Sequence, residues 1–130
     1  MTPNEYQKEA LRTDATAGYS SFYSFPDAAV LGSRIGNWQN ARLLNGLMGL
    51  SGESGEALDL LKKHIFQGHE LDREHLAKEL GDVAWYLALS ADALGFTLEE
   101  VLQTNISKLR ERYPQGFDAE KSTHRAAGDV

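Results

Sequence analysis

Two long helical patterns, separated by a short polar break, constrain the fold of this chain most strongly. Apolar residues recur with helical spacing from about Asn37 to Phe66, and again from about Asp72 to Leu94. The break between them is QGHELD, residues 67–72. Helices joined by so short a turn pack antiparallel. The two apolar stripes consist of Leu43, Leu47, Leu50, Ala57, Leu58, Leu61 and Ile65, and of Leu76, Leu80, Val83, Leu87 and Leu94.

The N-terminal segment combines a helix start with a long irregular stretch. Thr2 and Glu5 have the spacing of a capping box, which predicts a helix that ends near Arg12. Residues 13–36 contain glycine, serine, proline and four aromatic residues without a steady period. We expect a long loop there, and loops of this length in compact domains are often functional.

The C-terminal third of the chain has its own cap, helix and stop. Thr97 and Glu100 form a second capping-box match, so a third long helix is predicted to about Tyr113, where Pro114 stops it. Residues 117–130 are polar and are predicted to be a loosely held tail. Strand-like alternation is absent from the sequence. We therefore predict an all-α helical bundle with antiparallel long helices, completed by oligomerisation.

Size and charge exclude several classes of protein. A chain of 130 residues suits one domain, and a net charge of −6 gives no basic face for a nucleic-acid backbone. The chain has no cysteine, hence no thiolate metal site. It also lacks a run of about 18 apolar residues and an apolar N-terminal signal core. These features predict a cytoplasmic protein with neither a nucleic-acid nor a membrane partner.

Four acidic residues occupy matching positions on the two long helices. Glu53 and Glu56 are three residues apart and share one helix face, and so do Glu79 and Asp82. Both pairs lie on the same flank of their apolar stripe. One such pair alone is usually a solvated helix face. Two pairs in matched register predict four carboxylates that meet along the groove between the helices.

Carboxylates that meet in a partly dry groove repel one another unless a cation lies among them. Oxygen ligands alone favour a hard divalent cation, which is most simply Mg²⁺, with Mn²⁺ as a possible substitute. A di-iron bundle would use histidine three residues after glutamate, and no glutamate here has that partner. The pattern therefore favours a magnesium site over an iron site.

Glycine recurs every third residue beside the first acidic pair, at Gly46, Gly49, Gly52 and Gly55. Each costs about 1 kcal/mol relative to alanine in a helix. One explanation is that a helix or a ligand approaches the backbone closely here. The other is a break between two helices near residue 50. The sequence leaves both explanations open.

Polar residues interrupt the apolar side of the third helix. Asn105, Lys108 and Arg112 fall on its core side by helical spacing, so they need anionic partners there. Those partners are either the carboxylates, as structural ion pairs, or the phosphates of a ligand. Trp85 lies opposite the Leu76 stripe and suggests a second buried face, hence an oligomer interface. The histidines around the turn, His64, His69 and His75, are interpreted as surface residues.

Residues 40 to 117 resemble the MazG-like nucleotide pyrophosphohydrolases of the all-α NTP pyrophosphatase superfamily. The resemblance rests on the sequence GLSGESGEALDLLKKHIF, on AKELGDVAWYLALSADALGF, and on the following helix. The family hallmark is E-x-x-E followed on the next helix by E-x-x-D, matched here by Glu53-Glu56 and Glu79-Asp82. By this resemblance residues 37–116 form a MazG-like helical catalytic core, between an N-terminal helix and aromatic-containing loop (1–36) and a polar tail (117–130).

The resemblance implies a Mg²⁺-dependent enzyme that cleaves a nucleoside triphosphate between its α and β phosphates. The products would be a monophosphate and pyrophosphate, and the cellular role would be housekeeping of the nucleotide pool. The four acids would hold the metal, and one of them, Glu53 or Glu56, could act as general base. Asn105 and Lys108 would contact phosphates, with Arg112 and Lys63 as helpers. The family implies a homodimer or homotetramer with helices shared across the interface.

A second class of function stays open. The chain could be a helical oligomer that holds Mg²⁺-nucleotide, or a partner helix, without turnover, as a regulatory module. The presence of all four acids argues against this alternative, because a protein that has lost the family's catalytic activity often lacks one of them.

Overall fold

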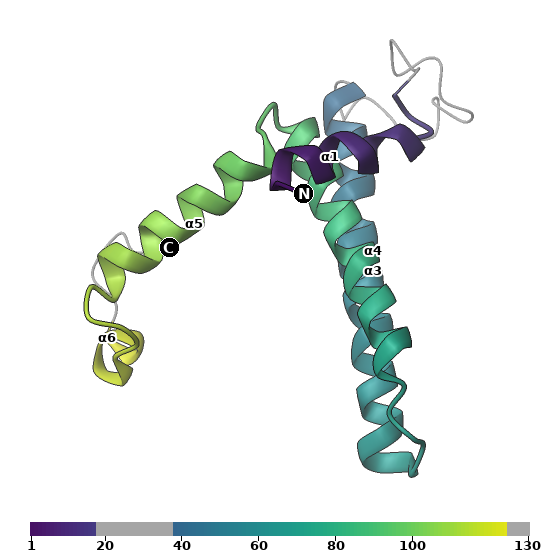
Figure 1. Ribbon diagram of the computed structural model, residues 1–130, viewed down its shortest axis with the longest axis vertical. Coiled ribbons are helices and arrows are strands. Elements are labelled where there is room, and N and C mark those ends of the chain that lie inside the picture. The colour runs from purple at the N-terminus through teal and green to yellow at the C-terminus, as the bar shows by residue number, and fades with distance from the viewer. Residues whose placement is uncertain (18–37, 125–130) are drawn as a thin grey trace.

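The computed structural model describes residues 1–17 and 38–124, and its elements are all helical. No strand occurs within these ranges, which confirms the all-α prediction. Two long helices run antiparallel side by side, α1 lies across one end of the pair, and α5 leads away from that end to α6 (Figure 1). The elements are α1 (Pro3–Ala10), the 3₁₀ helix η1 (Leu11–Thr13), α3 (Trp38–Gln67), α4 (Arg73–Ala93), α5 (Leu98–Arg112) and α6 (Ala119–Thr123).

Side-chain caps define three of the helix starts, and the sequence predicts two of these caps. Thr2 and Thr97 each form a capping box with the glutamate three residues later. Asp72 caps α4, because its Oδ1 accepts a hydrogen bond of 2.9 Å from the backbone N–H of His75. The first helix is slightly shorter than expected, since the α-helical turns end at Ala10 and a 3₁₀ turn continues to Thr13. These signals are local, which explains why the sequence alone locates the helix starts.

The α3 helix is continuous through all its glycines, so the alternative of a break near residue 50 is wrong. Gly46 and Gly49 are the points where α4 comes closest. A Cβ atom at Gly46 would lie 2.4 Å from Ser90 Oγ, and one at Gly49 would lie 2.1 Å from the Tyr86 ring. The absence of side chains at these two glycines therefore allows the close packing of α3 against α4.

The best-buried apolar residues belong to the end of the hairpin where α1 and the α4–α5 turn meet. Small side chains dominate this core, which contains Ala88, Leu89, Ala91, Ala93 and Leu98. The buried Gln7 side chain of α1 joins the elements: its Nε2 donates to the carbonyls of Ala88 (3.2 Å) and Phe96 (3.3 Å). Its Oε1 accepts from the backbone N–H of Leu98 at 2.9 Å. The N-terminal helix is thus attached to the long pair.

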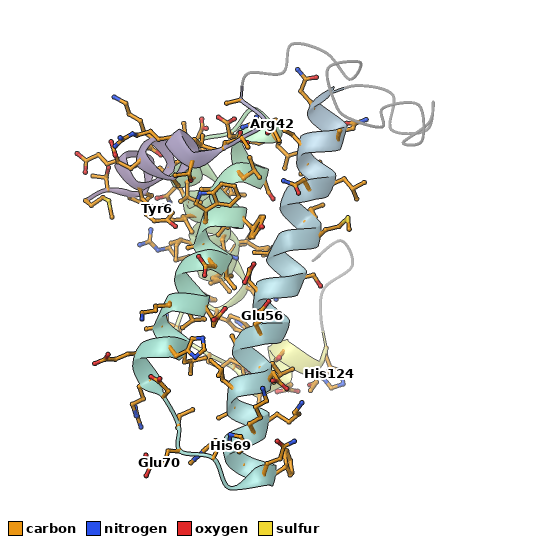
Figure 2. The ribbon with its side chains drawn as sticks, turned by 90° about the vertical axis from the view of Figure 1, so that its right-hand side faces the viewer. Tyr6, Arg42, Glu56, His69, Glu70 and His124 are labelled. Carbon is orange, nitrogen blue, oxygen red and sulfur yellow. The ribbon has the colours of Figure 1, made fainter. Side chains whose placement is uncertain are left out.

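A buried ion pair holds the start of α3 to the same end of the molecule. Arg42 reaches Asp14 at 2.6 Å and Asp92 at 2.7 Å, and the Asp14 side chain is only 1% exposed. Burial acts to raise the pKa of Asp14, but hydrogen bonds from Thr16 and Arg42 outweigh it and hold the pKa below its usual value. Arg42 is labelled at this end of the hairpin in Figure 2.

The tryptophan of α4 has a different role from the predicted one. Trp85 Nε1 donates to the Ala10 carbonyl at 3.0 Å and to Thr13 Oγ1 at 2.8 Å. The second face of α4 is therefore covered by α1 and η1 of the same chain. The prediction of an oligomer interface from Trp85 therefore loses this support, because a segment 72 to 75 residues away in sequence provides partners for the indole.

The α5 helix leaves the hairpin instead of packing along it (Figure 1). Consequently many apolar side chains of the long helices stay open to solvent. Three exposed apolar residues of α5 fall on one face of that helix, and others lie on the half of α3 near the 68–72 turn. The exposed residues include Leu58, Leu61, Ile65, Phe66, Leu80, Leu102, Ile106 and Leu109.

The predicted loop and tail are described only in part. Residues 18–37 and 125–130, which include most of the predicted loop, lie outside the described residues. The start of the tail forms a short helix, α6, capped by Asp118. Among the helices of the described ranges, none is long and apolar enough to cross a membrane.

Candidate metal and phosphate site

Three of the four predicted acids meet between α3 and α4. Glu53 and Glu56 come from α3 and Glu79 from α4, and one carboxylate oxygen of each lies within 4.8 Å of the others. Glu79 is buried, with 8% of its surface exposed, whereas Glu56 is exposed. Glu56 lies near the middle of the hairpin, between α1 and the turn that carries His69 and Glu70 (Figure 2). Such a group of oxygen ligands could hold a divalent cation.

Asp82, the fourth acid, is not among the three whose oxygens lie within 4.8 Å of one another, so the predicted meeting of four acids is found for three of them. It lines a hollow of about 460 Å³ together with Glu53 of the cluster. The remaining walls come from Thr13 at the end of η1 and from Trp85 and Tyr86 of α4. The two aromatic rings meet edge to face, with centroids 4.8 Å apart. This side of the site therefore combines carboxylates with aromatic walls.

A second hollow, of about 350 Å³, opens on the side toward the turn. Its walls carry charges of both signs: Glu56, Glu79 and Asp59 are acidic, while Lys63 is basic. Lys63 Nζ lies 2.6 Å from Asp59 Oδ2. Hydrogen bonds from Lys62 and Lys63 lower the pKa of Asp59 to about 2. The predicted phosphate ligand Lys63 is thus placed beside the carboxylate cluster.

Glycine keeps this second hollow open. Gly52 and Gly55 form part of its wall, and a Cβ atom at either position would meet nothing within 4 Å. They differ from Gly46 and Gly49, which face α4. The glycine repeat turns gradually around α3, because a step of three residues falls about 60° short of a full turn. Its first half therefore packs against a helix, and its second half borders the acids.

Mutual repulsion is visible at one member of the cluster. The pKa of Glu53 is raised, first because its carboxylate is partly removed from solvent and then because Glu56, Asp82 and Glu79 lie nearby. A cation among these groups would relieve the repulsion. The electrostatics therefore agree with the donor chemistry: the acids fit a hard divalent ion.

The structure adds a residue that the sequence analysis set aside. His75 is exposed, as expected, but its Nε2 lies 2.9 Å from Oε1 of Glu79, and its side chain lines the second hollow. The signal was present in the sequence, because residues four apart on a helix are neighbours. His75 precedes Glu79 by one helical turn, and the spacing alone does not distinguish it from His64 and His69 near the turn.

The predicted residues of the third helix are not brought to the acids within one chain. Asn105 and Lys108 are exposed on α5, which diverges from the hairpin (Figure 1). Arg112 is half-buried, with its guanidinium 5.9 Å from the centroid of the Tyr113 ring. The expectation that Asn105 and Lys108 point into the core is wrong for the single chain, because helical spacing fixes a face and not the direction in which the helix leaves the turn.

The fold and the site define an all-α protein whose two paired helices carry a carboxylate site suited to a divalent cation. Comparison with known families matches residues 43–117 to the MazG nucleotide pyrophosphohydrolase domain. This match covers more than half of the chain and all four acids. The chain belongs to the MazG nucleotide pyrophosphohydrolase family.

One relative carries a name without functional content. The Gene 37 protein of Mycobacterium phage L5 is 40% identical over 73 residues, which are 53% of this chain and 64% of the phage protein. The chain thus spans a little under two thirds of that relative. No solved structure gives a significant match.

Proposed function

We propose that the protein is a Mg²⁺-dependent pyrophosphohydrolase that converts a nucleoside or deoxynucleoside triphosphate to its monophosphate and pyrophosphate. The observation that carries the proposal is the meeting of Glu53, Glu56 and Glu79 within 4.8 Å across two helices of a MazG domain. Phosphoanhydride hydrolysis depends mainly on positioning and charge neutralisation. A divalent cation held by the three clustered carboxylates would serve both tasks.

The metal ligands in this proposal are Glu53, Glu56, Glu79 and Asp82. All offer oxygen, which favours Mg²⁺ and allows Mn²⁺ to replace it. A divalent ion held there would supply positive charge beside the phosphates and would favour ionisation of a water molecule. Glu53 or Glu56 would accept the proton of the attacking water as general base. Neighbouring side chains would thus hold the ion that neutralises the phosphates and accept the proton from the water.

The two hollows suggest how the substrate lies along the groove. The nucleoside fits the hollow lined by Trp85 and Tyr86, whose rings can contact a base. The β and γ phosphates fit the hollow whose walls include Lys63. The α–β bridge then falls beside the carboxylate cluster. Such an arrangement leaves a monophosphate on the aromatic side and pyrophosphate on the lysine side.

A second copy of the chain completes the site in this proposal. Leu102, Ile106 and Leu109 are each about 40% exposed on one face of α5. The half of α3 near the turn exposes Leu58 (66%) and Ile65 (59%). Mutual burial of such surfaces is the common route to a homodimer or homotetramer. Docking of α5 from one copy along the hairpin of another brings Asn105, Lys108 and Arg112 toward the phosphates.

The proposed setting is the cytoplasmic nucleotide pool. With a net charge of −6, the chain has little attraction for a nucleic-acid backbone, whereas a metal ion can mediate contact with a small phosphate ester. Free triphosphates are therefore the expected partners.

The test is pyrophosphate release from a panel of NTPs and dNTPs, with Mg²⁺ and then with EDTA. We expect release from at least one nucleotide, and its loss with EDTA. Glu79→Gln removes a buried metal ligand, so it should lower kcat by roughly 100-fold or more. Loss of a residue that only orients a metal ligand costs less, about 10–100-fold. Glu74→Gln, an exposed change on the same helix, is the matched control and should leave the rate unchanged.

Two results would contradict the proposal. A Glu79→Gln variant with wild-type turnover would show that the metal is held elsewhere. Absence of pyrophosphate from every nucleotide, with Mg²⁺ and with Mn²⁺, would favour the binding or regulatory module instead.

A further inference from the structure

His75 makes a direct contact with the most buried acid of the site. Its Nε2 lies 2.9 Å from Oε1 of Glu79, whose side chain is only 11% exposed. We propose that His75 is a positioning residue, which holds the Glu79 carboxylate in the orientation that binds the divalent cation. This inference rests on the proposed function, since it assigns a supporting role in the same site.

Glu79 needs such support more than the other acids. It is buried beside Glu53 and Glu56, so its carboxylate loses solvation and faces two like charges. Within residues 1–17 and 38–124, it is also the one acid of the four with a recorded ion-pair or hydrogen-bond partner. A carboxylate has two oxygens. The imidazole can fix one of them, and the group as a whole then keeps a single orientation toward the cluster.

The backbone holds His75 in place for this task. Its N–H donates to the capping carboxylate of Asp72 at 2.9 Å, in the first turn of α4. The side chain then extends along the helix to Glu79, four residues later, and forms part of the wall of the second hollow. Cap, histidine and carboxylate therefore form a continuous chain of contacts. Metal-binding carboxylates are commonly oriented by such outer contacts, whose loss costs about 10–100-fold in metal affinity or activity.

Two other roles for His75 make different predictions. As a direct phosphate ligand, the imidazole would affect nucleotide binding but not the binding of a metal ion alone. As a simple helix-stabilising pair, it would affect neither, because exposed pairs four residues apart contribute little. The affinity for a metal ion without nucleotide therefore separates the positioning role from both.

The experiment measures Mn²⁺ binding to the full chain without nucleotide, by titration calorimetry and by the electron paramagnetic resonance of free Mn²⁺. We expect His75→Ala to weaken binding by roughly ten-fold or more. His75→Gln should restore most of the affinity, because its side-chain amide can donate a hydrogen bond from a similar distance. His69→Ala changes an exposed histidine at the turn, outside both hollows, and should bind like the wild type.

The outcomes distinguish this inference from the proposed function. If Glu79→Gln loses Mn²⁺ but His75→Ala binds it normally, the positioning role is wrong and the metal site stands. A His75→Gln variant as weak as His75→Ala would also overturn the role, because the hydrogen bond would then not be its basis. If Glu79→Gln itself binds Mn²⁺ like the wild type, the proposed metal site is wrong. Circular dichroism of each variant verifies that it is folded.

Discussion

At the scale of single residues, the glycines of α3 show how one residue type serves two purposes. Gly46 and Gly49 lie where a side chain would collide with Ser90 and Tyr86 of α4. Gly52 and Gly55, one and two turns further on, border the hollow beside the acids and meet no neighbour. Glycine lowers the stability of the isolated helix at all four positions. At the first two positions it allows close packing against α4, and at the last two it leaves space beside the acids.

Gly49→Ala should destabilise the protein by about 1–3 kcal/mol, because the new methyl group forces the Tyr86 ring to shift. Gly55→Ala is the matched control on the same helix and should stabilise by about 0.5–1 kcal/mol, since it removes backbone freedom without a clash. Denaturant unfolding of both variants measures the difference. Equal stability of the two variants would show that α3 and α4 do not approach as closely as described.

At the scale of elements, the N-terminal helix is held by polar contacts from a distant part of the sequence. Gln7 satisfies three backbone groups of the α4–α5 region, and Trp85 in return donates to the end of α1 and to η1. This segment precedes the matched family region at 43–117, yet Thr13 lines the hollow beside Glu53. An element outside the family core thus contributes to the wall of the site.

Gln7→Leu should cost about 1–3 kcal/mol of stability, because it leaves the Ala88 and Phe96 carbonyls and the Leu98 N–H without their buried partner. Lys8→Ala, an exposed change on the next residue, should be close to neutral. Thermal unfolding followed by circular dichroism compares the two. If Gln7→Leu unfolds at the same temperature as the wild type, the packing of α1 does not depend on this contact.

At the scale of the whole molecule, the single chain is open. The α5 helix diverges from the hairpin (Figure 1). Apolar side chains on α5 and on the half of α3 near the turn are exposed. Large exposed apolar surfaces on a small domain mark interaction sites. The proposed second copy would cover them and would bring the polar residues of α5 to the acids.

Ile106→Glu places a charge in the middle of the exposed face of α5, so it should convert the oligomer to monomer and lower pyrophosphate release. Ser107→Glu adds the same charge about 100° around the helix, away from the apolar face, and should change neither property. Light scattering at micromolar concentration measures the mass. A wild-type chain of 14.4 kDa in solution would contradict the shared site.

Much of the site could be predicted from short-range patterns. The acid pairs have a fixed spacing on each helix, and the five-residue turn between α3 and α4 favours antiparallel packing of the two helices. Glu53, Glu56 and Glu79 therefore meet as the spacing suggests. The contact of His75 with Glu79 follows from the same spacing, but the histidine shows no pattern that distinguishes it from its neighbours until the carboxylate is seen to be buried.

The sequence by itself determined the helices, their caps and the face on which each acid lies, because these depend on residues within one or two helical turns of each other. Only the tertiary structure decided which glycines pack against α4, that α1 covers Trp85, and that α5 leaves the hairpin. The physical reason is separation along the chain. The contacts that fix these features join residues about 40 to 90 positions apart, and their energies depend on packing that no local period encodes.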